Sequence, residues 1–153
     1  MQHMANTEKP CLGWREWIAL PELGIAHLKA KVDTGAKTSA LHAFHLEEYR
    51  ERGVAMVRFR IHPIQRRNDV VITSEAQVID RRSVSDSGGH KETRLVIATQ
   101  LVLGGEQWPI EMTLTNRDNM QFRMLLGRTA IRGRYIVDPG KSYLQSTRPV
   151  TVG

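Results

Sequence analysis

The chain is poor in the residues that cross-link a fold or anchor it in a membrane. Cys11 is the single cysteine among 153 residues, which excludes an intramolecular disulfide framework and a multi-thiolate zinc site and suits a reducing compartment. The apolar runs, such as residues 101–103, are far shorter than the roughly 20 residues that cross a bilayer. The N-terminal residues show no apolar stretch of the signal-peptide type. We therefore expect a cytoplasmic protein without a membrane span.

Acidic residues are also in deficit. The chain has 16 Asp and Glu against 22 Lys and Arg, a formal charge of +6. Hydrophobic residues make up 41% and charged residues 25%, as in an ordinary globular domain. An excess of positive charge attracts anions, and charge alone leaves nucleic acid, an anionic membrane and an acidic peptide open as partners.

Short extended segments separated by turn residues predict an all-β fold. Residues 54–61 alternate apolar and polar side chains, as a half-buried strand does, and residues 101–103 and 108–114 flank a Gly-Gly turn. We expect one domain over residues 12–145. A flexible segment, 1–11, part of which is a candidate cloning remnant, precedes it, and a tail, 146–153, follows it.

One segment has the chemistry of a reactive site. Asp33 ends an apolar strand and is followed by Thr34 and Gly35, so a carboxylate is placed in a tight loop whose glycine allows close backbone approach. Asp-Thr-Gly also makes an ordinary turn. The tripeptide by itself leaves a structural role and a catalytic role equally open.

A second element in the later part of the chain favours the catalytic role. Residues 124–131 combine apolar residues with Gly127 and Arg128 and then open a short helix. A strand ending in Asp-Thr-Gly-Ala, followed by a hairpin and then by an apolar pair with Gly-Arg, resembles the retropepsin-type aspartic peptidases. More closely, residues 13–17, 32–43, 113–117 and 124–128 resemble the bacterial RimB family, and the resemblance runs from about Leu12 to Leu144.

The resemblance implies a retropepsin-like closed barrel with one short C-terminal helix, and an aspartic endopeptidase with Asp33, Thr34 and Gly35 as the catalytic motif. Such hydrolysis uses two carboxylates that share one proton. Because the chain has one such motif, we expect a homodimer in which the second carboxylate comes from Asp33 of an identical subunit. A turn residue in a monomer is the alternative.

Members of the family often carry the label "ATP-dependent zinc protease", and the sequence does not favour it. There is no His-Glu-x-x-His motif and no phosphate-binding Gly-x-x-x-x-Gly-Lys-Ser/Thr loop, and the six histidines are scattered. His42 and His45 are three residues apart without further ligands. We expect no catalytic metal and no cofactor.

The remaining site residues follow from the same resemblance. The flap is expected in residues 84–94, with Ser87, Gly88 and Gly89 at its tip, although a long hairpin without function is equally compatible with the sequence. Leu125, Leu126 and Gly127 are expected to support the Asp33 loop. Arg128 is expected to form a dimer salt bridge or to face solvent.

Basic residues near these motifs favour an acidic ligand, because arginine binds carboxylates through paired hydrogen bonds. The candidate substrate-binding residues are Lys37, Arg82, Lys91 and Arg94. The family resemblance implies a glutamylated protein as substrate, such as a small-subunit ribosomal protein with a poly-glutamate tail. Two rivals stay open. One is a basic β-barrel that binds nucleic acid or ribosome without catalysis, and the other is a silent scaffold, in which Lys37 disables Asp33 instead of binding glutamate.

Overall fold

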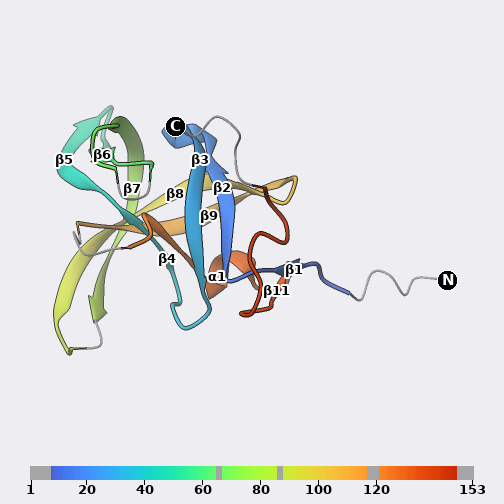
Figure 1. The fold of residues 1–153 in the computed structure, drawn as a ribbon. Coiled ribbons are helices and arrows are strands. Elements are labelled where there is room, and N and C mark those ends of the chain that lie inside the picture. Colours follow the sequence, from blue (N-terminus) through green and yellow to red (C-terminus); the bar gives the residue numbers. More distant parts are fainter. Residues whose placement is uncertain (1–7, 65–66, 86–87, 117–120, 148–153) are drawn as a thin grey trace.

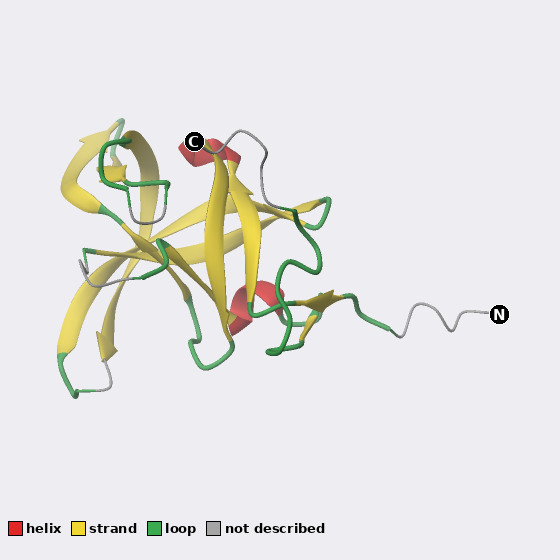
Figure 2. Ribbon diagram, in the orientation of Figure 1, coloured by secondary structure: helices red, strands yellow, loops and turns green. Residues whose placement is uncertain are grey.

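The structure, a computed structural model, describes residues 8–64, 67–85, 88–116 and 121–147. Strands dominate it, as Figure 2 shows, which confirms the predicted all-β class. In the described part of the chain no helix is long or apolar enough to cross a bilayer. In chain order the elements are β1 (Cys11–Leu12), β2 (Arg15–Leu20), η2 (Pro21–Leu23), β3 (Ile25–Asp33), β4 (Ser39–His42), β5 (Phe44–Glu51), β6 (Val54–Ile61), β7 (Ile72–Ser85), β8 (Lys91–Leu103), β9 (Glu106–Thr115), β10 (Met124–Gly127), α1 (Arg128–Ile131) and β11 (Ile136–Val137).

The strands form one large sheet that curls into a ring. Its order is β2-β3-β10-β4-β9-β8-β7-β6-β5, and β2 also pairs with β8 through Ala19 and Val102. Strands β5 and β6 extend outward from this ring with one end of β7 (Figure 1). The short strands β1 and β11 pair in parallel as a separate two-stranded sheet.

Period-two alternation decides which side chains enter the core. In β6, Val57, Phe59 and Ile61 are buried, while Arg58 and Arg60 between them are exposed, as predicted. Strand β2 alternates in the same way, so its even-numbered residues point inward. The core is completed by leucines from several strands of the ring, among them Leu28, Leu41, Leu101, Leu114 and Leu126.

The hairpin of β7 and β8 is much longer than the flap expected at residues 84–94. It runs from Ile72 to Leu103, because a register shift between Val78 and Asp80 lets one continuous strand pass through a stretch that the sequence pattern divided in two. Gly89 near the turn has φ 83°, a conformation that favours glycine. Ser87 of the predicted tip lies outside the described residues.

A segment near the C-terminus lies along the start of β2, on the edge opposite β3. We call residues 141–146 the strap. The Trp14 amide donates to the Lys141 carbonyl at 2.7 Å, and the Tyr143 amide donates to the Arg15 carbonyl at 3.0 Å. The strap thereby continues the hydrogen bonding that β2 begins with β3 on its other edge.

A buried carboxylate fixes the strap. Glu16 is fully buried, and its oxygens accept hydrogen bonds from the amides of Gly13 (2.7 Å), Leu144 (2.8 Å) and Gln145 (3.1 Å) and from the Ser146 hydroxyl (2.6 Å). A buried carboxylate is stable only when its lone pairs are satisfied, and here backbone donors satisfy them. Glu16 therefore ties the start of β2 to a segment almost 130 residues away.

Candidate functional site

The predicted reactive aspartate ends β3 at an open loop. Asp33 is half-buried, and its Oδ1 accepts a hydrogen bond from the Gly35 amide at 3.1 Å. Its carbonyl accepts the Ala36 amide, also at 3.1 Å. We call residues 33–38 the Asp33 loop. The loop holds the carboxylate in one orientation while Thr34 and Gly35 stay exposed.

Gly127 of β10 packs against the backbone at the end of this loop. It lies opposite Asp33 in the parallel register of β10 and β3. A Cβ atom at Gly127 would lie 2.7 Å from the carbonyl carbon of Thr38 and 2.8 Å from the Ser39 nitrogen, so only glycine fits here. The Gly127 amide donates to the Ser39 hydroxyl at 3.0 Å. Leu126 is fully buried and Leu125 is partly exposed.

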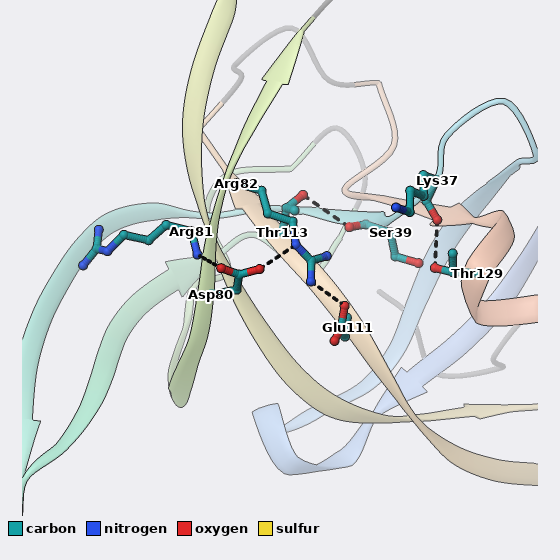
Figure 3. Close-up of polar contacts among 8 residues, drawn as sticks. All are labelled: Lys37, Ser39, Asp80, Arg81, Arg82, Glu111, Thr113 and Thr129. Atoms are coloured by element: carbon teal, nitrogen blue, oxygen red, sulfur yellow. Dashed lines mark hydrogen bonds and ion pairs between the residues drawn. The ribbon is translucent and has the colours of Figure 1, made fainter.

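Helix α1 docks on carbonyl oxygens of the same loop. The Arg128 amide donates to the Ala36 carbonyl at 2.9 Å, and the Thr129 hydroxyl donates to the Lys37 carbonyl at 2.8 Å, a contact visible in Figure 3. Nη1 of Arg128 donates to the Gly35 carbonyl at 3.1 Å. Arg128 thus anchors the loop of its own chain, a role that the sequence analysis missed.

Several cations near the Asp33 loop have no carboxylate partner. In the described part of the chain, Lys31, Lys37 and Arg132 make no ion pair, and Arg128 bonds to carbonyl oxygens only. Lys31, Lys37 and Arg132 are also exposed. Their charge is therefore available to an external anion.

A groove lies beside the loop. It has a volume of about 560 Å³, and Thr34 and Arg128 contribute to its lining together with apolar residues such as Val32 and Ile131. Ile136, which also lines it, is 56% exposed. The groove places an apolar surface next to the cations.

The arginines of the long hairpin are arranged differently. Arg82 donates to Asp80 at 2.9 Å and to Glu111 at 2.8 Å, so its guanidinium lies between two carboxylates (Figure 3). Arg94 is only 11% exposed and pairs with Glu92 at 2.5 Å. In the residues described, the side-chain partners of Arg82 and Arg94 lie on β7, β8 and β9. Glu111 on β9 also lines a pocket with Thr129, whose hydroxyl donates to the Lys37 carbonyl of the Asp33 loop. Lys91 is exposed opposite Ser85, and it makes no ion pair with any residue that the structure describes.

These ion pairs shift the ionisation of the hairpin groups. The Arg81 amide, and after it the Arg82 guanidinium, hold the pKa of Asp80 below its usual value. Hydrogen bonds to Glu111 and then to Asp80 raise the pKa of Arg82. Because the guanidinium of Arg82 is already paired with two carboxylates of its own chain, it attracts an external anion only weakly.

No group of three or more His, Cys, Asp and Glu residues is placed to hold a metal ion within the ranges that the structure describes. His42 is buried on β4, whereas His45 on β5 is exposed with φ 53°. The two imidazoles therefore do not share a face, as a helical spacing would have allowed.

Comparison with known proteins decides the family. Residues 11–148 match the RimB-like family, described as "Retropepsin-like aspartic endopeptidase RimB". The chain belongs to the RimB-like family. A Legionella pneumophila protein of unknown function has a similar solved structure, with a TM-score of 0.76 and 27% identity over 90% of this chain and 99% of that one.

The curated relatives of this RimB-like chain carry a different activity in their names. A protein of Parasynechococcus marenigrum is 50% identical over 90% of this chain, and one of Shewanella pealeana is 45% identical over 90%; both are named "Probable alpha-L-glutamate ligase". The chain spans 29% and 30% of the lengths of these two relatives.

These names overturn one prediction. Four curated relatives, 45–50% identical to the RimB-like chain, are named as ligases and not as peptidases. A ligase joins the bond that an endopeptidase breaks, so the predicted aspartic endopeptidase, and with it the assignment as a hydrolase or protease, is wrong. The family resemblance itself is confirmed. The peptidase activity was expected from the family resemblance, and no motif in the sequence indicated a glutamate ligase.

Proposed function

We propose that this chain is a binding component of α-L-glutamate ligation that holds an acidic, glutamate-bearing polypeptide beside the Asp33 loop. The observation that supports it is the set of cations around this loop, Lys37, Arg128 and Arg132, that have no carboxylate partner in the described structure. The names of the relatives, glutamate ligases, support glutamate as the acidic residue of the ligand.

The way these cations are held suits carboxylate binding. Arg128 is oriented by carbonyl oxygens, which fix the guanidinium without neutralising it. Arginine can then bind a carboxylate through two parallel N–H donors, while lysine contributes a mobile point charge. Asp33 has a complementary role, since its exposed oxygen accepts a backbone amide of the bound peptide.

The ligand proposed here is the glutamate tail of a modified protein, including a ribosomal protein of the small subunit. Binding the growing tail next to a ligase would raise its effective concentration at the site of glutamate addition. We propose further that two copies of the chain associate so that their Asp33 loops face one another and form one cationic surface. Mass measurement of the purified protein at micromolar concentration tests the dimer, and a strictly monomeric mass rejects it.

Titration of the full chain with fluorescein-labelled α-linked hexaglutamate tests the binding function. We expect saturable, salt-sensitive binding that weakens about 100-fold in a Lys37→Gln, Arg132→Gln double variant, because two charged contacts are lost. Arg60→Gln is the matched control, since Arg60 is an exposed cation on the distant strand β6. Absence of hexaglutamate binding, or equal weakening by the control, would overturn the proposal.

A further inference from the structure

The outer face of β2 and β3 brings two cations into direct opposition. Arg15 and Lys31 are Cα partners in the antiparallel register of these strands. Side chains at such positions have Cβ atoms about 5 Å apart, and like charges there repel each other. Neither cation has an ion pair in the described residues. An anion between them would remove the repulsion.

Arg15 is held rigidly by neutral groups. Its guanidinium carbon lies 4.6 Å from the centroid of the Trp14 ring and 5.0 Å from that of Tyr143, and Nε donates to the Ser142 hydroxyl at 3.1 Å. These cation–π contacts fix the guanidinium plane and leave its full charge unneutralised. Its terminal nitrogens remain as donors.

The carboxylate nearest in sequence cannot neutralise Arg15. Glu16 points to the opposite side of β2, where it is buried and hydrogen-bonded by the strap. The same strap presents Tyr143 to Arg15. We call Trp14, Ser142 and Tyr143, which together hold Arg15, the clamp. Glu16 therefore fixes the strap that carries Tyr143 of this clamp, but it does not neutralise the charge of Arg15.

We propose that Arg15 and Lys31, with Trp14 and Tyr143 as side walls, form an anion subsite that binds one side-chain carboxylate of an acidic peptide. This rests on the proposed function, because it extends the same surface. Lys31 lies two residues before Asp33 on the same face of β3, so the subsite adjoins the Asp33 loop. A peptide that lies along β3 can thus place one glutamate in this subsite and continue toward the cations of the Asp33 loop.

The aromatic groups favour a carboxylate over a nucleic acid. Single-stranded RNA binds sheets by stacking bases on exposed ring faces. Here Arg15 covers Trp14 and Tyr143, and Tyr143 itself stacks on Trp17 with centroids 6.4 Å apart. The rings are already in use as walls of the clamp.

Two substitutions at Lys31 test the subsite by hexaglutamate titration and thermal unfolding. Lys31→Gln is expected to weaken hexaglutamate binding about 10-fold, because one charged contact is lost. Lys31→Glu places a carboxylate opposite Arg15, so we expect binding to be lost while the melting temperature rises by a few degrees. Arg60→Gln, which removes a cation on β6, is expected to change binding less than twofold.

The outcomes separate the subsite from the proposed function. Wild-type binding that Lys31→Gln leaves unchanged rejects the subsite alone. Wild-type protein that binds no hexaglutamate rejects both. A Lys31→Glu variant that melts lower than wild type contradicts the repulsion between Arg15 and Lys31. Tighter, Lys31-dependent binding of a labelled single-stranded RNA would reassign the subsite to phosphate.

Discussion

The β7–β8 hairpin and the surface around β2, β3 and the Asp33 loop are both rich in cations, yet they use them in opposite ways. In the hairpin, Arg82 and Arg94 are paired with carboxylates of the same chain. Around the Asp33 loop, Arg15 and Arg128 are held by ring faces, a hydroxyl and carbonyl oxygens. Neutral anchors fix a guanidinium and leave its charge for a ligand, so the choice of anchor, more than the number of cations, identifies the anion-binding surface.

The largest expected effect comes from damaging the support of the Asp33 loop while leaving the hairpin intact. Gly127→Ala forces a Cβ against the backbone of Thr38 and Ser39, at 2.7–2.8 Å. Since backbone atoms cannot swing aside, we expect a loss of about 3 kcal/mol in the free energy of unfolding, measured with urea. Ser83→Ala on exposed β7 is the control, and a Gly127→Ala protein as stable as this control would contradict the packing argument.

The next effect concerns the clamp on Arg15. Glu16→Gln keeps the size of the side chain but turns one acceptor oxygen into a donor facing amide N–H groups of Gly13 and the strap. We expect a loss of about 2–3 kcal/mol in stability, because buried donors lose a charged partner. The same variant should weaken hexaglutamate binding, since Tyr143 is no longer fixed beside Arg15. An unfolding curve that coincides with that of the wild type would show that Glu16 does not hold the strap.

A matched pair of substitutions compares a cation of the Asp33 loop with a cation of the β7–β8 hairpin. Lys37→Gln removes a cation without an ion pair in the described chain, whereas Arg82→Gln removes one already bonded to Asp80 and Glu111. Hexaglutamate binding should weaken about 10-fold for the first and less than twofold for the second. Equal effects on the dissociation constant would show that net charge, and not pairing, determines binding.

The smallest effect is the pH response of the hairpin. The folded-state pKa of Asp80 is lowered from 3.8, so its contribution to stability is present above that value and is lost as pH falls through the folded pKa. Below about pH 4, wild type should lose slightly more stability than Asp80→Asn, in which this group does not titrate. Thermal unfolding from pH 6 to 3 measures the difference, and parallel curves would mean that Asp80 makes no pH-dependent contribution.

Sequence patterns identified the parts of the fold that depend on neighbouring residues. The alternation of residues 54–61, the hairpin after Leu103 and the helix that follows Gly127 are all present. The extent of β7 and the arginine pairings were not foreseen, since Arg82 meets Glu111 only because β8 brings β7 and β9 together. The clamp was missed for the same reason. Trp14 and Arg15 are adjacent in the sequence, but Tyr143, which also contacts Arg15, lies more than 120 residues later. No local sequence pattern predicts a contact of that range.

The bonds of Glu16 also have a consequence for how the protein matures. They join Glu16 of β2 to residues 144–146 of the strap. Contacts between residues so far apart in the sequence form late in folding, because the intervening chain must first be ordered. A nascent chain that has been synthesised only as far as β10 has every cation of β2 and β3 but lacks Tyr143. Affinity for an acidic peptide would then report that the strap has been synthesised and has docked on β2.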